Sequence, residues 1–248
     1  SVKDRTGLYM VEDAIKDCRL KRGSTIVEAT AGNTGLGVAF AALNQGFHVI
    51  FVVPEKFSEE KQILMKALGA DIIHTKREDG MLGAATKAQE LLSEIKDSIS
   101  LQQFKNMSNP KAHYETTGPE IYQDLDGKID YLVAGAGSGG TYSGVVKFLK
   151  EQNRNIKGIL ADPVGSTMGG GEHADYDIEG IGNDFIAETM DMSLVDKVIK
   201  INDPQAFDGA RSLARHEGIL GGSSTGAAFS AALKLIYEHH VKGNIVFI

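Results

Sequence analysis

Three glycine-rich turns divide this chain, and each turn lies between an apolar run and a stretch with helical periodicity. The turns span residues 30–35, 135–141 and 221–226, and they read TAGNTG, GAGSGGT and GGSSTG. Glycine lets the backbone approach a ligand closely, and a helix that begins after the turn directs its unpaired N–H groups and positive dipole end toward that ligand. The three turns therefore predict a fold that holds a small anionic molecule at several points.

Short β-branched runs alternate with amphipathic stretches, which predicts an α/β protein with mainly parallel sheets. With 248 residues, 42% of them hydrophobic, the chain suits one large domain or two lobes. The spacing predicts strands at residues 25–27, 49–53, 71–74, 131–134, 158–161 and 197–201. It predicts helices at residues 35–44, 58–68, 83–95, 116–125, 143–150 and 203–217 (capped by Asp203), and a last helix that follows the third glycine turn and ends near residue 239. Asn and Pro interrupt this rhythm near residues 103–110, where a lobe boundary is expected.

Composition excludes several classes of function. A net charge of −7 without a block of Lys or Arg argues against binding to nucleic acid or to an anionic membrane. No uncharged apolar stretch is long enough to span a bilayer. Cys18 is the single cysteine, so a disulfide framework and a cysteine zinc site are excluded; a half-buried thiol on a helix and a cytoplasmic location are expected. No histidine pair has metal-ligand spacing, so no metal site is expected. The first residue is not Met and residues 244–248 resemble an interrupted strand, which suggests a longer protein truncated at both ends.

The second turn, taken alone, leaves three interpretations open. Gly135, Gly137 and Gly140 match the pattern G-x-G-x-x-G after a strand, and Asp162 ends the next strand near the spacing of a ribose-binding acid. This pattern is typical of an NAD(P)-dependent oxidoreductase, but it also fits another phosphate site or simple tight packing. A P-loop is excluded because no Gly-Lys-Ser/Thr follows any turn.

The first and third turns carry uncharged polar side chains that have two interpretations. Thr30, Asn33 and Thr34 could surround a carboxylate with hydroxyl and amide donors. The same residues could instead be helix caps and local Asx or Ser/Thr turns, and so could residues 223–225.

The whole chain resembles the fold type II pyridoxal-phosphate enzymes, specifically the cysteine synthase / cystathionine β-synthase family. The motifs that carry the resemblance are SVKDR at the start, EATAGNTG, PEK, LGA, NP followed by TTGPE, EGIG and SSTG. This resemblance implies a tryptophan synthase β-like fold of two lobes, each a mainly parallel twisted sheet flanked by helices. It implies a smaller, mobile lobe over residues 1–105, with Lys3 and the asparagine loop (residues 30–35, in the EATAGNTG motif), and a larger phosphate-binding lobe over residues 106–248.

The resemblance also assigns roles to single residues. Lys3 would form the Schiff base with pyridoxal 5′-phosphate and then serve as general acid and base. Gly137, Ser138, Gly139, Gly140 and Thr141 would hold the cofactor phosphate at a helix N-terminus. Asn33 would contact the 3′-oxygen of the cofactor, and Ser224 would bind its pyridine nitrogen. The substrate carboxylate would be bound by Thr30, Ala31, Asn33, Thr34 and Gln103.

These roles imply a β-replacement reaction. A serine at the pyridine nitrogen makes the ring a weaker electron sink than an aspartate would, which favours loss of a β-substituent followed by addition of a thiol. Ala31 stands where typical cysteine synthases carry serine, and Asn183 stands where eukaryotic cystathionine β-synthases carry tyrosine. This mixture resembles bacterial enzymes that make cystathionine from O-acetylserine and homocysteine. Serine as donor, sulfide as acceptor with cysteine as product, a homodimer, and closure of the lobes on the substrate carboxylate are further expectations from the family.

Overall fold

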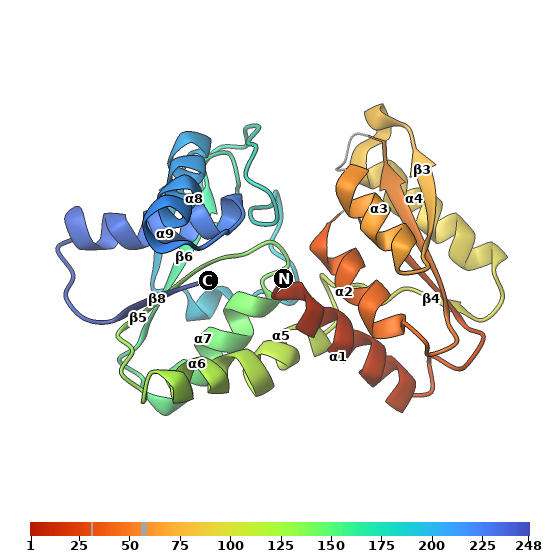
Figure 1. The fold of residues 1–248 in the computed structure, drawn as a ribbon, viewed down its shortest axis with the longest axis horizontal. Helices are drawn as coiled ribbons and strands as arrows, with labels where there is room; N and C mark the ends of the chain where they lie inside the picture. Colours follow the sequence, from red (N-terminus) through yellow and green to blue (C-terminus); the bar gives the residue numbers. More distant parts are fainter. Residues whose placement is uncertain (31, 56–58) are drawn as a thin grey trace. The chain divides into compact units, whose positions relative to one another are not determined.

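The computed structural model of this protein describes residues 1–30, 32–55 and 59–248. The chain forms two compact units, residues 1–109 and 110–248. Each unit is built on a parallel four-stranded sheet with helices on both faces (Figure 1). The predicted α/β fold of two parallel-sheet lobes is therefore confirmed. The mobility expected of the first lobe stays a prediction.

The first unit has the strand order β3-β2-β1-β4, and all pairs are parallel. Its strands are β1 (Thr25–Ala29), β2 (His48–Pro54), β3 (Asp71–Thr75) and β4 (Ser98–Ile99). Its helices are α1 (Lys3–Lys16), α2 (Asn33–Ala42), α3 (Glu59–Ala67), the 3₁₀ turn η1 (Arg77–Asp79) and α4 (Gly80–Glu94), and the short α5 (Ser108–Ala112) crosses the boundary.

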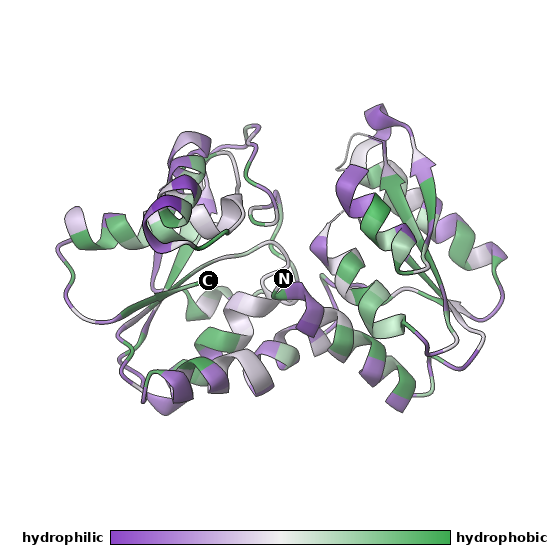
Figure 2. Ribbon diagram, in the orientation of Figure 1, coloured by the Kyte–Doolittle hydropathy of each residue, from purple (hydrophilic) through white to green (hydrophobic). Residues whose placement is uncertain are grey.

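Alternation along the strands places the helices on two faces of this sheet. Ile26 and Phe51 pack with α1, α2 and α3, whereas Val27 and Val52 pack with α4 on the opposite face. Successive side chains of a strand point to opposite faces, so a strand buried on both faces becomes a continuous apolar run. Much of the sheet of this unit accordingly has the hydrophobic colour in Figure 2, although β1 contains Glu28 and β2 begins with His48.

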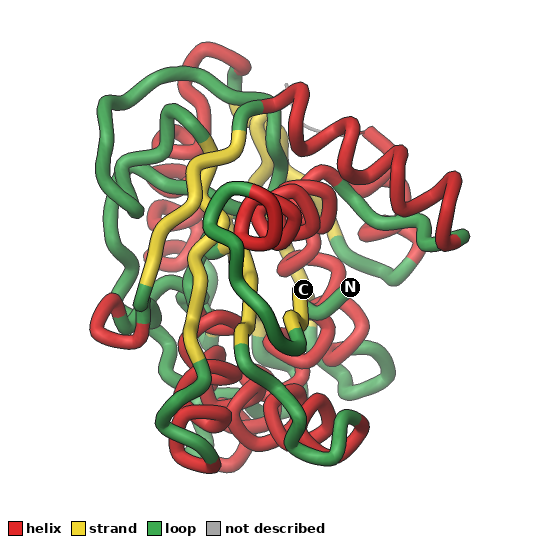
Figure 3. The backbone as a smooth tube through the Cα atoms, turned by 90° about the vertical axis from the view of Figure 1, so that its left-hand side faces the viewer, coloured by secondary structure: helices red, strands yellow, loops and turns green. Residues whose placement is uncertain are grey.

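The second unit has the strand order β7-β6-β5-β8, again with all pairs parallel. Its strands are β5 (Tyr131–Gly135), β6 (Lys157–Pro163), β7 (Lys197–Ile201) and β8 (Ile245–Phe247), and they lie side by side in Figure 3. Its helical elements are the π-helical turn η2 (His113–Thr117), α6 (Gly118–Asp124), α7 (Gly140–Gln152), the 3₁₀ turn η3 (Met192–Leu194), α8 (Asp203–Glu217) and α9 (Ser223–Tyr237). The helices α6 and α7 cover one face of the sheet, and α8 and α9 cover the other.

Some local predictions were wrong. The helix α1 was not predicted, and neither was the helical path through α5 and η2, because Pro110 was interpreted as a break. Pro110 lies in the first turn of α5, where a missing N–H costs nothing. Cys18 is exposed, with a φ of 59°, just beyond α1, so it is not the expected half-buried helical thiol. The cap of α8 is Asn202, which forms a capping box with Gln205, so Asp203 is the first helical residue.

Two further observations concern expectations from composition. The segment 165–179, which is rich in Gly, Asp and His, contains no helix or strand. Within the described part of the chain, no helix has the length and apolar character needed to cross a bilayer. The predicted helix start at Ser58 lies outside the described residues.

Candidate functional site

Helices α1 and α2 cross closely, and the crossing brings the backbone of Lys3 against the first half of α2. Lys3 is the first residue of α1, and Asn33 is the first residue of α2. A Cβ on Gly37 would lie 2.5 Å from the Lys3 carbonyl oxygen, and a Cβ on Gly7 would lie 2.2 Å from the Gly37 carbonyl carbon. Only hydrogen atoms at both positions let the two backbones approach this closely. Gly7 and Gly37, which sequence reasoning missed, therefore bring the backbone of the predicted Schiff-base lysine against α2, about one turn after Asn33.

The amine of Lys3 has unusual acidity for a lysine. Burial lowers the pKa of Lys3 from 10.5 to about 8, because a charged ammonium loses its hydration in the folded protein. A lysine with such a pKa has a substantial neutral fraction near physiological pH. The neutral amine is the form that attacks a carbonyl carbon, so this side chain is suited to Schiff-base formation.

The asparagine loop is fastened to a distant turn through side chains. Thr30 and Thr34 are buried, and the Thr34 hydroxyl donates to the Gln103 amide oxygen at 2.6 Å. Asn109 in turn donates its amide to the Gln103 main-chain oxygen at 2.9 Å. The structure thus brings together Thr34 and Gln103, two of the predicted carboxylate ligands. Asn33 is exposed at the start of α2, and Ala31 lies outside the described residues.

A buried carboxylate that the sequence did not reveal fixes the other end of this arrangement. Glu28, in β1, accepts hydrogen bonds from the Ser100 hydroxyl at 3.0 Å, from the Gln102 N–H at 3.1 Å, and from the Leu101 N–H. Burial raises the pKa of Glu28, and these three donors oppose that shift. Glu28 therefore anchors the turn that immediately precedes Gln103. Its signal in the sequence was only its place at the end of a strand next to the first turn.

The glycine turn of the second unit, residues 135–141, has its carbonyl groups fixed from one side. We call these residues the phosphate cradle and residues 182–189 the backing segment. The backing segment donates to three successive cradle carbonyls: Gly182 N–H to Ala136 at 2.8 Å, Asn183 Nδ2 to Gly137 at 2.7 Å, and Thr189 Oγ1 to Ser138 at 2.5 Å. In a trans peptide the N–H points opposite to the carbonyl. The N–H groups of residues 137–139 therefore point away from the backing segment, which makes an anion-binding concavity.

The start of α7 extends this concavity. Gly139 adopts φ 80° and ψ −9°, and α7 begins at Gly140, so the first-turn N–H groups of the helix follow directly. Thr141 is buried in that first turn, as is Ser138 in the cradle. A run of convergent N–H groups with hydroxyl side chains at a helix N-terminus fits a phosphate group. The cradle thus fits the phosphate of pyridoxal phosphate.

The cradle positions are glycine for another reason than the close approach to a ligand that the sequence suggested. A Cβ on Gly137 would lie 2.7 Å from the Gly180 oxygen, and a Cβ on Gly139 would lie 2.4 Å from Met190 Cβ. A Cβ on Gly135 would lie 2.5 Å from Ile181 Cγ2. These glycines are required by the approach of residues 180–190, because any side chain there would overlap protein atoms.

The third glycine turn places Ser224 in the first turn of α9. Ser223 begins this helix, and its hydroxyl accepts a hydrogen bond from the Glu179 N–H at 3.0 Å. Ser224 is half-buried next to it. A side chain at this position lies at the positive end of the helix dipole.

Asp162 has an environment that does not support the nicotinamide alternative. Its carboxylate is fully buried and accepts from Lys200 Nζ at 2.5 Å and from the Gly169 N–H at 3.0 Å. Lys200 also donates to the Ser166 carbonyl at 2.7 Å. The acid thus anchors the segment after β6 and has no exposed oxygen for a ribose. The nicotinamide interpretation of the G-x-G-x-x-G pattern is therefore not supported.

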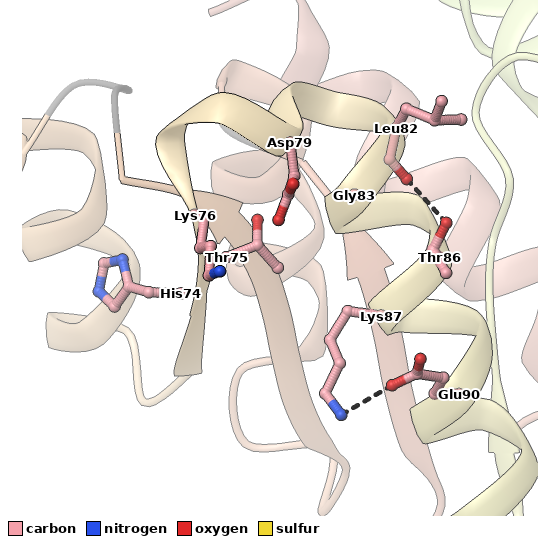
Figure 4. Close-up of a pocket in the computed structure, with 9 residues that line it drawn as sticks. All are labelled: His74, Thr75, Lys76, Asp79, Leu82, Gly83, Thr86, Lys87 and Glu90. Atoms are coloured by element: carbon pink, nitrogen blue, oxygen red, sulfur yellow. Dashed lines mark hydrogen bonds and ion pairs between the residues drawn. The ribbon is translucent and has the colours of Figure 1, made fainter.

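A shallow groove of about 630 Å³ lies elsewhere on the first unit (Figure 4). It runs along β3, η1 and α4, and Lys87 pairs with Glu90 there at 2.9 Å. Its lining contains none of the predicted site residues. The described residues also contain no cluster of His, Cys, Asp and Glu that could hold a metal ion.

Comparison with known proteins gives one consistent result. The family model described as pyridoxal-phosphate dependent enzyme matches residues 1–248. The O-acetylserine dependent cystathionine beta-synthase of Bacillus subtilis is 49% identical over 99% of this chain and 80% of its own length. The cysteine synthase of Helicobacter pylori strain J99 is 46% identical over 94% of this chain and 77% of its own length.

Solved structures agree with these relatives. The O-acetylserine dependent cystathionine beta-synthase of Helicobacter pylori superposes with a TM-score of 0.92 at 44% identity, covering 100% of this chain and 80% of that one. The cysteine synthase of Entamoeba histolytica superposes with a TM-score of 0.95 at 38% identity, covering 100% of this chain and 74% of that one.

Proposed function

The chain belongs to the pyridoxal-phosphate dependent enzymes of the cysteine synthase and cystathionine β-synthase type, and within that family we propose that it replaces the β-substituent of O-acetylserine, or of serine, by a thiol. The proposal is supported by one feature of each unit: the first contains Lys3, whose pKa is lowered by burial, and the second contains the phosphate cradle, whose carbonyls are held by the backing segment. When bound, pyridoxal phosphate supplies the electron sink on which the β-substituent is lost.

Each end of the cofactor has a matching group on this chain. The cradle N–H groups and the Thr141 hydroxyl bind the phosphate, and Lys3 supplies the amine and later moves the proton at the substrate α-carbon. Asn33 would contact the 3′-oxygen of the cofactor. Ser224, in the first turn of α9, would donate its hydroxyl to the pyridine nitrogen, and the positive end of this helix would disfavour protonation of that nitrogen. The Ser224 hydroxyl would thus form a hydrogen bond without transferring its proton, and this would limit the electron withdrawal to what β-replacement needs.

The substrate carboxylate is bound by the Thr30 hydroxyl, by Gln103, and by the backbone around Ala31, Asn33 and Thr34; the Thr34 hydroxyl proton is already donated to Gln103. The amide NH₂ group is the donor of the Gln103 side chain, and the hydrogen bond from Thr34 to its amide oxygen orients it. Uncharged donors suffice here, since hydrogen bonds to a carboxylate are stronger than neutral ones. The turn anchored by Glu28 keeps Gln103 at this position.

Homocysteine is the proposed acceptor, which makes cystathionine the main product, and sulfide with cysteine as product is the second candidate. The choice rests on the similarity to two proteins named O-acetylserine dependent cystathionine beta-synthase, one by sequence and one by structure. The relatives named cysteine synthase support the second candidate. A homodimer is proposed on family grounds alone.

Product analysis tests this proposal. The purified protein with pyridoxal phosphate is given O-acetylserine together with equimolar homocysteine and sulfide, and amino-acid products are measured by mass spectrometry. Cystathionine in excess is expected, and the reaction with serine as donor is slower. Cysteine as the dominant product reverses the choice of acceptor. Absence of both products refutes β-replacement.

The role of Lys3 is tested by covalent trapping. Borohydride reduction of the loaded protein is expected to fix the cofactor to the peptide that contains Lys3. Lys3→Ala removes both the adduct and turnover, whereas Lys16→Ala, at the exposed end of the same helix, changes neither. An adduct on any other lysine contradicts the assignment.

A further inference from the structure

A buried histidine, His113, lies behind the phosphate cradle, and it has no role in the proposed β-replacement. His113 is fully buried at the start of the π-helical turn η2. Its Nε2 lies 3.1 Å from the Thr141 hydroxyl, and its Nδ1 lies 2.9 Å from the Thr117 hydroxyl. The three side chains thus form a chain of hydrogen bonds that ends at a cradle residue. Turns of π-helix occur frequently at functional sites.

The packing of η2 against α7 fixes this geometry. A Cβ on Gly144 would lie 2.2 Å from the Pro110 oxygen, 2.8 Å from the Tyr114 nitrogen and 2.9 Å from His113 Cβ. Gly144 lies one turn after Thr141 on α7, so the two positions share a face of that helix. The missing side chain at Gly144 therefore lets η2 approach α7 closely enough for the imidazole to reach Thr141.

The direction of the hydrogen bonds follows from what each group has to offer. A hydroxyl has a single proton, and a neutral imidazole has one N–H and one acceptor nitrogen. If Thr141 donates to His113, its hydroxyl presents only lone pairs to an anion in the cradle. If His113 Nε2–H donates to Thr141, the Thr141 proton is available for the anion. The second arrangement requires that the Thr117 hydroxyl donates to Nδ1.

We propose that His113 is a positioning residue that donates Nε2–H to Thr141 and thereby commits the Thr141 hydroxyl proton to the cofactor phosphate. This inference rests on the proposed function, because it takes the cradle ligand to be the phosphate of pyridoxal phosphate. His113 does not touch the cofactor. It acts through Thr141, and Thr117 selects the required tautomer of its ring.

The test separates the phosphate from the rest of the cofactor. Cofactor-free wild-type protein and variants are titrated with pyridoxal 5′-phosphate and with pyridoxal, which lacks the phosphate, and binding is followed by absorbance. His113→Leu is expected to weaken binding of pyridoxal 5′-phosphate about tenfold to a hundredfold, the size of a lost hydrogen bond to a charged group. Its binding of pyridoxal changes by less than about twofold on the same reasoning.

Further variants make the test specific. His113→Gln places an amide donor toward Thr141 and is expected to recover part of the affinity. Thr117→Val keeps the shape but removes the donor to Nδ1, so it is expected to weaken pyridoxal 5′-phosphate and not pyridoxal. His216→Leu, on the exposed surface of α8, is the matched control and binds both ligands normally. The ³¹P resonance of the bound cofactor shifts in His113→Leu and Thr117→Val, and stays in place in the control.

The outcomes are distinct. Equal losses for both ligands in His113→Leu and Thr117→Val assign His113 a purely structural role and overturn the inference. Unchanged affinity for pyridoxal 5′-phosphate in Thr117→Val also overturns it, including in the case that His113→Leu does not fold. If either of these two results is found but the wild-type protein binds pyridoxal 5′-phosphate, only the role of His113 is refuted and the proposed function stands. A wild-type protein that does not bind it refutes the proposed function itself.

Discussion

The asparagine loop, residues 30–35, and the phosphate cradle, residues 135–141, both connect a strand to a helix through glycine, but their glycines meet different surroundings. At Gly137 and Gly139 an added Cβ would overlap residues 180–190 at less than 3 Å. At Gly32 an added Cβ would meet no described atom within 4 Å. The packing of residues 180–190 requires glycine at both cradle positions, whereas a side chain at Gly32 would face open space among the described residues.

The same contrast appears in how the two loops are held. The cradle has three successive carbonyls fixed by the backing segment, so its N–H groups point in one direction before any ligand arrives. The asparagine loop depends on a side-chain contact from Thr34 to Gln103, in a turn held by Glu28. A preorganised anion site lowers the ordering cost of binding, whereas a loop held by side chains leaves part of its order to the substrate. We infer that the cradle defines cofactor affinity and that the asparagine loop defines substrate response.

The largest effect is expected for Gly139→Ala. Its φ of 80° strains any residue with a Cβ, and the overlap with Met190 Cβ adds to that strain. The sum predicts a loss of about 3 kcal/mol in the free energy of unfolding, together with weak cofactor binding. Urea denaturation of the cofactor-free protein measures it. Gly170→Ala is the matched control, because φ is 84° there and no described atom lies within 4 Å of the added Cβ, so only the strain remains. Equal losses in the two variants would contradict the packing role.

A smaller effect of opposite sign is expected for Lys3→Met in the cofactor-free protein. Below about pH 8 the ammonium is buried with its charge, so its removal should stabilise the fold by roughly 1–3 kcal/mol. Between pH 8 and 10.5 the folded state releases the proton that the unfolded state still holds. Wild-type stability therefore rises with pH in this window, and the advantage of the variant shrinks.

Urea denaturation across this pH window checks the prediction for Lys3→Met. Lys16→Met is the control, because that ammonium is exposed at the end of α1 and its removal should leave stability almost unchanged at every pH. A stability difference for Lys3→Met that does not vary with pH would show that burial does not lower the pKa of Lys3.

The sequence predicted the repeating strand and helix pattern well because its signals are local. The strand at 197–201 has the predicted bounds, and the helix at 203–217 ends where predicted and differs only in its cap. Both lie between clear turn residues and have regular periodicity. The path through Pro110 was missed, since a proline in the first turn of a helix looks like a break when no neighbours are known.

From the sequence, only those site residues could be predicted that lie within recognisable motifs. The resemblance gave Lys3, the asparagine loop and the cradle as positions, and the structure added the groups that fix them. Glu28, His113 and Asn183 lie far along the chain from the residues that they hold, in the case of Glu28 more than 70 positions away. No periodicity or spacing links such partners, because the contacts arise only when the sheets and helices are packed. The reason for the cradle glycines was hidden in the same way.

The smallest effect on stability, and the sharpest division between the two loops, is expected for Gly32→Ala. Gly32 has φ −133°, which an alanine adopts without strain, and its added Cβ meets open space among the described residues. Loss of backbone freedom in the unfolded chain should stabilise the variant by about 0.5 kcal/mol. The same methyl group would occupy space beside the proposed carboxylate site, so KM for O-acetylserine is expected to rise at least about tenfold while cofactor affinity is unchanged. Thermal unfolding, cofactor titration and initial rates measure the three quantities. A variant that loses stability or cofactor affinity as Gly139→Ala does would show that both loops are packed by the protein in the same way.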